Sequence, residues 1–275
     1  MEGWQIALAC VGAGLLLLLA VWLFLIAPRA RKKAIGPFLT TYAHRGAWGE
    51  GIPENSLAAF RRAAELGFAI ELDVQLSSDG EVMVFHDYTL DRMCGVEGKL
   101  SELDAAALGK LRLGESDQYI PTLREVLEAV AGRVPLLIEL KGESTDTSLV
   151  APLLALLAGY KGEWCVESFN PMLLAAVKKQ APQVVRGLLV SDLIKDKKNG
   201  SRLLNFALSA MLLNFLCRPA FVAWNEKYPR SLSRFAAIRL FGAASLNYTI
   251  RDEGDYHRHL AAGTYPIFEG FVPEK

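Results

Sequence analysis

Apolar residues along this chain form one long uncharged run near the start and then many shorter runs separated by mixed segments. From Gly36-Pro37 onward, strand-like and helix-like runs alternate. The candidate strands are Thr41–His44, Phe68–Leu76, Val82–His86, Leu136–Lys141, Trp164–Ser168, Val184–Val190, Phe221–Trp224, Ser245–Ile250 and Pro266–Phe268. Candidate helices between them include Ser56–Leu66, Thr122–Ala131, Ser148–Gly159 and Pro171–Gln180. This alternation predicts an α/β fold with a parallel sheet covered by helices.

The chain length favours one closed form of that fold. About 240 of the 275 residues remain after the first 35, which suits a single TIM (β/α)8 barrel. Nine strand-like runs are one more than a barrel needs. Asp79-Gly80 joins two of them as a tight turn, so those two are expected to be antiparallel or to form one continuous excursion. The pattern does not tell which run lies outside the barrel.

The long apolar run, Gly3 to Pro28, contains no charged residue. About 20 such residues span roughly 30 Å of hydrocarbon as a helix. Trp4 and Trp22 lie near its ends, where indoles favour the membrane interface. Residues 1–28 are therefore predicted to form a single transmembrane anchor. A cleaved signal peptide is the alternative, but this run is longer than a usual signal core, and neither a positive segment before it nor an A-x-A site after it is present.

A basic linker is predicted over residues 29–37, followed by the barrel domain over 38–275. The linker cations are Arg29, Arg31, Lys32 and Lys33. Only Glu2 precedes the apolar run, so the positive-inside rule places the barrel in the cytoplasm. The linker cations also suit anionic headgroups of the bilayer, which is an expected partner.

A second apolar run, Leu203–Cys217, is uncharged but too short to span a bilayer comfortably. The cations that flank it are Lys195, Lys197, Lys198, Arg202 and Arg218. Such a segment suits a position in the membrane interface, and it equally suits an ordinary buried helix that covers the barrel.

Composition excludes several classes of protein. The 30 Lys and Arg balance the 30 Asp and Glu, so nothing indicates nucleic-acid binding. The four cysteines are scattered and form no C-x-x-C pair, which argues against a disulfide framework or a zinc site. Nothing in the composition indicates an oligomeric state.

Two strand-like runs carry charged residues at alternate positions. Glu71 and Asp73 point to the same side of one strand, and Glu139 and Lys141 share a side of another. In an antiparallel sheet such a side would simply face solvent. Parallel barrel strands are covered by helices, so the carboxylates would converge inside and need a cation. Ligation by oxygen alone favours Ca²⁺ or Mg²⁺ over zinc.

Two of the four histidines end strand-like runs beside a charged residue, in His44-Arg45 and His86-Asp87. Such a pair suits general acid–base catalysis near neutral pH, although His86-Asp87 also fits a cap or turn. Arg45 and Lys141 are usable phosphate ligands, against the alternative of ordinary surface cations. Glu54-Asn55-Ser56 precedes a helix and fits a capping sequence.

In chain order, these motifs resemble the glycerophosphodiester phosphodiesterase family, whose pattern is HRG, PENT or PENS, E-x-D and HD. The matching segments are Ala43–Gly46, Pro53–Ser56, Glu71–Val74, Asp79-Gly80, Val84–Asp87 and Ile138–Lys141. The resemblance implies a phosphatidylinositol-phospholipase-C-like TIM barrel that hydrolyses glycerophosphodiesters to an alcohol and glycerol 3-phosphate. It implies that His44 and His86 are the acid–base pair and that Arg45 and Lys141 contact phosphate. The resemblance also implies that Glu71, Asp73 and Glu139 bind the metal, with Glu54 joining them. It implies that Asn55 helps to position Glu54 and belongs to the substrate-binding residues.

The second half of the chain departs from the family pattern. Asn247-Tyr248-Thr249-Ile250 stands where many members have W-T-V-N, and Pro266–Gly270 stands where many have I-I-T-D. Tyr248 and Glu269 are therefore expected to line the alcohol pocket, or else to serve packing and capping at the barrel end. These departures affect the substrate rather than the reaction.

The family mechanism leaves two choices open: which histidine is the acid, and whether water or the glycerol 2-hydroxyl attacks first. One alternative function is cleavage of membrane lysophospholipids in a lysophospholipase-D-like way. A non-catalytic lipid-binding protein is a second. A TIM-barrel sugar hydrolase is a third, but it leaves the histidines and the Arg45 and Lys141 cations without a role.

Overall fold

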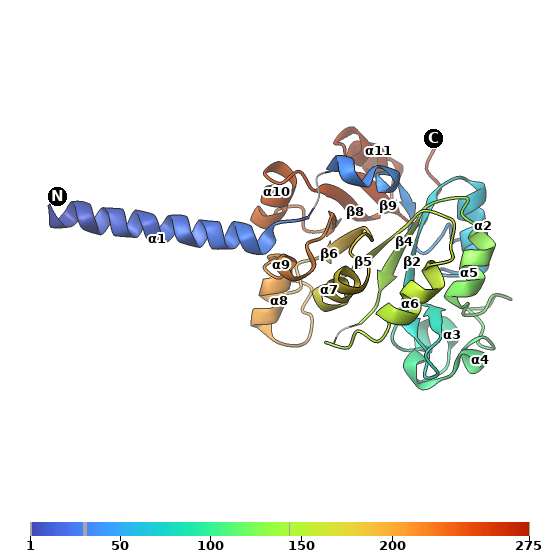
Figure 1. Ribbon diagram of the computed structural model, residues 1–275. Helices are drawn as coiled ribbons and strands as arrows, with labels where there is room; N and C mark the ends of the chain where they lie inside the picture. The colour runs from blue at the N-terminus through green and yellow to red at the C-terminus, as the bar shows by residue number, and fades with distance from the viewer. Residues whose placement is uncertain (1, 30–31, 143, 275) are drawn as a thin grey trace.

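The computed structural model describes residues 2–29, 32–142 and 144–274 (Figure 1). A straight helix of 24 residues, α1 (Gly3–Ile26), projects from the side of a barrel domain. This helix is almost entirely exposed. Within the described residues it is the one helix long and apolar enough to cross a membrane.

Eight parallel strands close into a barrel, which confirms the predicted fold. Their order is β1-β9-β8-β7-β6-β5-β4-β2, and β1 also pairs with β2 to complete the circle. The barrel strands are β1 (Tyr42–Ala43), β2 (Ala69–Leu76), β4 (Leu136–Leu140), β5 (Trp164–Ser168), β6 (Arg186–Val190), β7 (Phe221–Asn225), β8 (Ala244–Ile250) and β9 (Tyr265–Phe268). The remaining run, β3 (Val82–Val84), pairs antiparallel with β2 and lies outside the barrel. Gly80, with φ of +85°, forms the turn that joins them.

Helices surround the barrel, as the alternating pattern predicts. After the 3-10 helix η1 (Lys32–Phe38), they are α2 (Leu57–Glu65), α3 (Asp91–Cys94), η2 (Leu100–Glu102), α4 (Ala105–Leu108), α5 (Leu123–Val130), α6 (Val150–Leu157), α7 (Pro171–Gln180), α8 (Arg202–Ser209), α9 (Asn214–Cys217), α10 (Leu232–Arg239) and α11 (Glu253–Ala261). Helix α2 begins as expected at Ser56, whose hydroxyl accepts a hydrogen bond from the Ala59 N–H at 3.1 Å. Its apolar side, including Phe60, packs into the core.

The barrel interior has two layers of different character. The lower layer, toward the amino ends of the strands, is apolar. It includes Tyr42, Ala69, Leu137, Cys165, Leu189, Ala223, Leu246 and Ile267. Two residues further along the strands, the same inward side carries Glu71 on β2, Glu139 on β4 and Glu167 on β5. Glu139 is in register with Glu167 and with Asp73, whereas Glu71 is in register with Leu137. The acidic layer thus lies toward the carboxyl ends of the strands, where TIM barrels carry their active sites.

The expected basic linker is not a free spacer. Residues 30–31, and with them Arg31, lie outside the described residues. Further along, Ile35 and Phe38 are buried against the apolar lower layer of the barrel, and the Tyr42 hydroxyl donates to the Phe38 carbonyl at 3.0 Å. The second half of the predicted linker therefore closes the amino end of the barrel.

The last turn of α1 is bound to the barrel. Ile26 is fully buried in the main core, and its carbonyl accepts a hydrogen bond from the Asn214 side chain at 3.0 Å. The Arg218 guanidinium donates to the carbonyls of Phe24 at 2.8 Å and Ala27 at 3.0 Å. The final carbonyls of a helix have no partner within it, and here the barrel supplies donors. Burying Ile26 adds roughly 1.5–3 kcal/mol to this contact.

The apolar segment Leu203–Cys217 is not one helix. Its first part lies in α8, where Leu203 is 78% exposed, and its last part forms α9, where Cys217 is buried. Helix α9 packs against α1 and α7. Only α9 is therefore a buried covering helix, whereas α8 exposes apolar side chains.

Candidate active site

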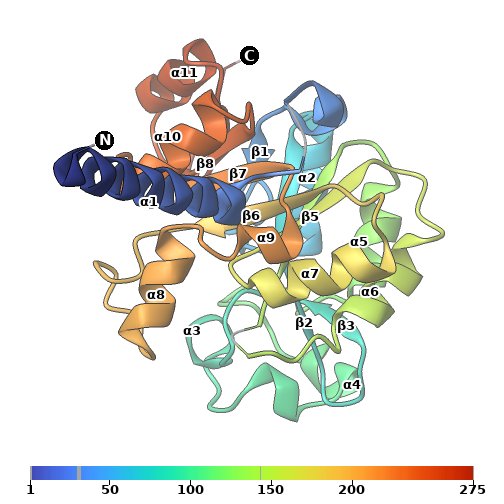
Figure 2. The same ribbon diagram turned by 60° about the vertical axis from the view of Figure 1, so that its left-hand side comes forward.

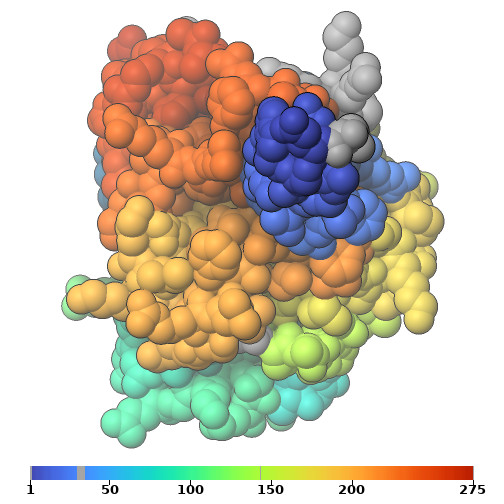
Figure 3. All heavy atoms as spheres, turned by 90° about the vertical axis from the view of Figure 1, so that its left-hand side faces the viewer, coloured from blue at the N-terminus to red at the C-terminus, as the bar shows by residue number. Residues whose placement is uncertain are grey.

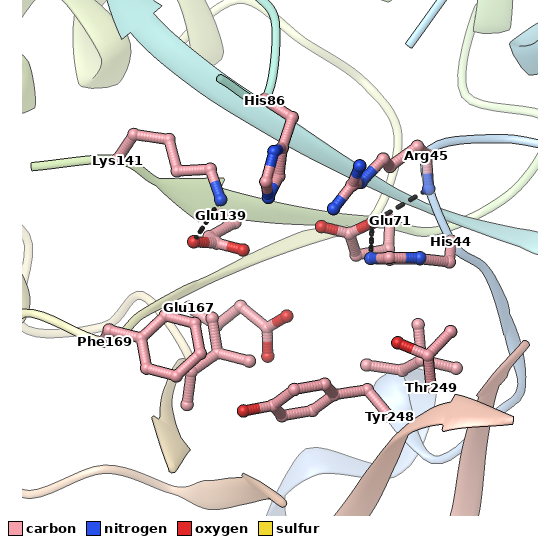
Figure 4. Close-up of a pocket in the computed structure, with 12 residues that line it drawn as sticks. His44, Arg45, Glu71, His86, Glu139, Lys141, Glu167, Phe169, Tyr248 and Thr249 are labelled. Atoms are coloured by element: carbon pink, nitrogen blue, oxygen red, sulfur yellow. Dashed lines mark hydrogen bonds and ion pairs between the residues drawn. The ribbon is translucent and has the colours of Figure 1, made fainter. Parts of the chain in front are cut away.

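An open pocket lies at the carboxyl ends of the barrel strands (Figure 4). Its lining residues are His44, Arg45, Glu71, His86, Glu139, Lys141, Glu167, Phe169, Leu189, Tyr248, Thr249 and Ile267. The structure thus brings together seven residues that the sequence nominates as site residues and that lie far apart along the chain.

Three carboxylates form the centre of this site. Glu71 and Asp73 extend from β2, and Glu139 lies beside Asp73 on β4. One oxygen of each lies within 4.8 Å of the others, and all three residues are buried. Burial and the neighbouring carboxylates raise the pKa of Glu71 well above its ordinary value. Burial raises the pKa of Glu139 to about 7, against the opposing effect of Lys141. Burial and mutual repulsion thus disfavour full negative charge on this cluster, and a nearby cation would favour it.

Asp73 is the best supported of the three carboxylates. Lys141 Nζ lies 2.9 Å from its Oδ1, the Asn55 side chain donates to its Oδ2 at 2.8 Å, and Arg45 Nε lies 3.5 Å away. Burial alone would raise the pKa of Asp73, but Lys141, His86 and Arg45 hold it well below its ordinary range. Asn55 is itself buried, holds Asp73 and does not line the pocket, and its contact with substrate stays a prediction.

The turn after β1 places Arg45 over this cluster. Arg45 has φ of +57° and Gly46 has φ of +84°. A Cβ at Gly46 would lie 2.8 Å from the Ala59 Cβ, so helix α2 leaves room only for glycine there. The Arg45 backbone N–H donates to Glu71 at 2.9 Å, which directs that carboxylate toward the pocket.

His44 is held by a carboxylate from the last strand. Its Nδ1 bonds to Glu269, and its Nε2 lies 3.9 Å from a Glu71 oxygen. Glu269 also pairs with Arg251. Burial would raise the pKa of Glu269, but His44 and Arg251 lower it to about 2. Glu269 does not belong to the pocket lining and binds His44, and its place in the alcohol pocket stays a prediction.

His86 has a similar arrangement on the other side of the pocket. Its Nδ1 lies 2.6 Å from Asp87 Oδ1, and Asp87 is in turn bound by Arg92. Burial lowers the pKa of His86, as do the Lys141 and Arg45 charges, and together they outweigh the opposing effects of Asp73 and Asp87.

Glu54 stands apart from the three-carboxylate cluster. Its Oε1 accepts hydrogen bonds from Arg45 at 2.8 Å and Arg92 at 2.6 Å. Burial would raise its pKa, but the two arginines lower it. Because both cations bind the same oxygen, Glu54 bridges the two arginines here, and its place among the metal ligands stays a prediction.

Three further polar residues that sequence reasoning missed also shape the site. Glu167 is buried, faces the pocket and has one oxygen, Oε2, without a hydrogen-bond partner. The Gln75 side chain donates to the carbonyls of residues 85 and 87 and so holds the His86 loop. A carboxylate within the strand-like run Trp164–Ser168 is the same signal that identified Glu139. Arg92 follows no such pattern, since its role depends on a tertiary contact.

Tyr248 lies across the pocket from the acidic cluster, and its ring meets Phe169 edge-on at 6.2 Å (Figure 4). Its hydroxyl donates to the Val190 carbonyl at 3.0 Å. The aromatic face, and not the hydroxyl, is therefore what Tyr248 presents to the pocket.

Comparison with known proteins gives a consistent result. A curated glycerophosphodiester phosphodiesterase of Caldanaerobacter subterraneus is 40% identical over 158 residues, which cover 54% of this chain and 65% of the relative. A glycerophosphodiester phosphodiesterase of Bacillus subtilis is 28% identical over 257 residues, which cover 85% of this chain and 84% of the relative. A solved phosphodiesterase of Oleispira antarctica, in complex with the product sn-glycerol-3-phosphate, superimposes with a TM-score of 0.70 at 26% identity, covering 84% and 92%.

The family model extends over almost the whole barrel. The glycerophosphoryl diester phosphodiesterase family model matches residues 44–272, from the first pocket histidine to just beyond the last strand. With the barrel and the arrangement of its acidic pocket, this match shows that the chain belongs to the glycerophosphoryl diester phosphodiesterase family.

Proposed function

We propose that this protein hydrolyses glycerophosphodiesters to an alcohol and glycerol 3-phosphate with the help of a divalent cation. The observation that carries the proposal is a cluster of three buried carboxylates at one open pocket, which two of them line together with two histidines and two cationic side chains. Family membership and the product named for the Oleispira structure point to the same substrate class.

The acidic cluster suits a hard divalent cation. Glu71, Asp73 and Glu139 offer only oxygen, the donor preferred by Ca²⁺ and Mg²⁺. The raised pKa values of Glu71 and Glu139 reflect negative charges that a bound cation would offset. When bound there, a cation supplies Lewis acidity and neutralises charge that builds on the phosphoryl oxygens.

Phosphate binding falls to Arg45 and Lys141. Lys141 directs its ammonium to Asp73 and Glu139, which leaves one of its three N–H donors for a phosphate oxygen. Arg45 uses one terminal nitrogen on Glu54 and retains other donors toward the pocket. Both cations thus hold the carboxylate cluster and have capacity for an incoming anion.

The two histidines carry out proton transfer. A carboxylate holds Nδ1 of each ring, Glu269 for His44 and Asp87 for His86, so each ring offers Nε2 to the reacting groups. One ring accepts the proton of the attacking hydroxyl or water, and the other protonates the leaving alcohol.

The far side of the pocket receives the glycerol end of the substrate. Burial and the nearby Glu139 charge raise the pKa of Glu167 well above its ordinary value, which favours the neutral carboxyl. A neutral carboxyl both donates and accepts, which fits a glycerol hydroxyl. Tyr248 and Phe169 form the apolar wall beside it.

We infer further that α1 is a retained single-pass anchor and that the barrel is cytoplasmic. The burial of Ile26 and the contacts of Asn214 and Arg218 with the last turn of α1 support retention, because cleavage would leave these groups without partners. The cations after the helix support the orientation. Protection of the barrel from protease added outside intact cells is the expected result.

The test uses the full chain, since the end of α1 is part of the core. Glycerol 3-phosphate release from glycerophosphocholine and glycerophosphoethanolamine is measured after metal removal and after addition of Ca²⁺ or Mg²⁺. We expect metal-dependent release that His44→Ala reduces by about 10²–10⁴-fold, the range for general acid–base catalysis. A His257→Ala variant, altered on the exposed side of α11, serves as the matched control.

Folded, metal-loaded protein that releases no glycerol 3-phosphate would overturn the proposal. Lysophosphatidylcholine in membranes, assayed in parallel, separates the lysophospholipase-D-like alternative. Binding of lipid without turnover of any diester would instead favour a non-catalytic lipid-binding protein.

A further inference from the structure

Helix α1 leaves the barrel through a face formed by α8, α9 and α10. Figures 2 and 3 show α8 and α10 on two sides of the point where α1 emerges. Helix α1 contacts α9 and α10 directly, and Arg218, just after α9, binds its last turn. The direction of α1 relative to this face is therefore set by specific contacts.

The two flanking helices expose an unusual amount of apolar surface. The exposed side chains are Leu203 (78%), Leu204 (50%) and Phe206 (51%) around α8, and Leu232 (72%), Phe235 (57%) and Leu240 (64%) around α10. Every other exposed large apolar residue in the described part of the barrel is at most 41% exposed. Scattered exposed apolar residues are ordinary, but the six most exposed lie on two helices beside the same exit.

The segment that carries both helices is basic although the whole chain is neutral. Residues 197–240 contain a single acidic residue, Glu226. Their eight cations are Lys197, Lys198, Arg202, Arg218, Lys227, Arg230, Arg234 and Arg239, of which Lys227 pairs with Asp196. Arg202 and Arg239 are exposed on α8 and α10 themselves, next to the apolar side chains. Short helices that combine exposed Leu and Phe with Arg are typical of membrane-interface helices.

We propose that the face formed by α8 and α10 rests in the headgroup region of the bilayer that α1 crosses, with its cations on anionic lipids. The proposal relies on the retained anchor inferred above. A bilayer around α1 meets the face from which that helix emerges. The exposed apolar side chains then enter the headgroup boundary, and Arg202 and Arg239 meet phosphate and carboxylate groups. The barrel is thus docked in one orientation and does not hang from a flexible tether.

Fluorescent labels in the full chain test this contact. Phe206→Cys and Phe235→Cys are labelled with the polarity-sensitive dye NBD after Cys10 and Cys94 are replaced by serine. Cys165 and Cys217 are buried, so they are shielded from the reagent. Val96→Cys, just after α3 on another side of the barrel, is the matched control. In lipid nanodiscs holding one chain, we expect blue-shifted emission and quenching by nitroxide lipid at positions 206 and 235, and neither effect at 96.

The charge contribution has its own comparison. Adding phosphatidylserine to phosphatidylcholine nanodiscs is expected to increase the quenching at positions 206 and 235. Arg202→Glu combined with Arg239→Glu should abolish that increase and leave hydrolysis of soluble glycerophosphocholine unchanged, because both residues lie outside the pocket.

The docking surface would be overturned if the emission wavelength at positions 206 and 235 equalled that at position 96 in both lipid mixtures. If glycerophosphocholine is still cleaved in that sample, the proposed function stands on its own. Protein that fails to enter nanodiscs would reject the anchor and the docking surface together. A blue shift seen only when two chains share a disc would identify the face as a dimer interface and would likewise overturn the proposal.

Discussion

The two halves of the barrel carry different parts of the function. Residues 44–141, from the end of β1 to the end of β4, contain the three clustered carboxylates and both pocket histidines. They also contain the two cationic residues that we propose bind phosphate. The second half contributes Glu167, Tyr248 and Glu269, together with the exposed helices α8 and α10. The comparison teaches that the residues proposed for the reaction come from one short, motif-rich stretch. The later strands supply a carboxylate that holds His44 and the remaining wall of the pocket.

The comparison predicts that Asp73→Asn causes the largest loss of catalytic activity. This change removes a charge that Lys141, Arg45 and Asn55 all hold in the cluster. We expect kcat/KM for glycerophosphocholine to fall by at least about 10²–10³-fold, as when one preorganised electrostatic group is lost. Affinity for Ca²⁺ or Mg²⁺, followed by calorimetry, should fall in parallel. Asp117→Asn in an exposed loop is the matched control, and unchanged metal affinity in the Asp73 variant would contradict the ligand assignment.

Glu269→Gln tests the contribution of the second half to stability. The pKa of Glu269 falls from an ordinary 4.5 to about 2, because His44 and Arg251 outweigh the effect of burial. A carboxylate with a lowered pKa stabilises the fold above its ordinary pKa, and this stability disappears as pH falls toward about 2. We expect the wild type to exceed the variant by roughly 1–3 kcal/mol in unfolding free energy at pH 6. Urea unfolding at several pH values measures this difference in unfolding free energy. A difference that stays constant down to pH 2 would count against the pairing of Glu269 with His44 and Arg251.

Glu167 should give the smallest effect. Since its pKa is raised by burial, we expect Glu167→Gln to keep most activity, because an amide also donates and accepts. Glu167→Leu should lower kcat/KM about tenfold through KM, the value of roughly one hydrogen bond to substrate. Steady-state kinetics with glycerophosphocholine distinguishes the two. If kcat/KM fell as far in Glu167→Leu as in Asp73→Asn, the proposed difference between the two halves would be wrong.

Much of the first half could be predicted because its signals are local. Alternation along a single strand places Glu71 and Asp73 on one side, and the same rule applies to Glu139 and Lys141. Strand and helix positions followed from the apolar runs, within a few residues at each end. The order of the motifs was enough to identify the family.

Other features depend on contacts between distant segments. Glu54 meets Arg92 only after the α3 segment folds over the pocket, and Glu269 reaches His44 only when β9 pairs with β1 to close the barrel. Sequence spacing does not report such pairings, so Glu54 was expected among the metal ligands and Glu269 in the alcohol pocket.

The sequence by itself determined the strands, the long apolar helix and the residue types of the site, because period and motif are properties of neighbouring residues. The tertiary structure decided which strand-like run lies outside the barrel and that Glu167 joins the pocket. It also decided that α8 stays exposed while α9 is buried. These outcomes depend on barrel closure and on the docking of α1, which bring together groups that no local pattern connects.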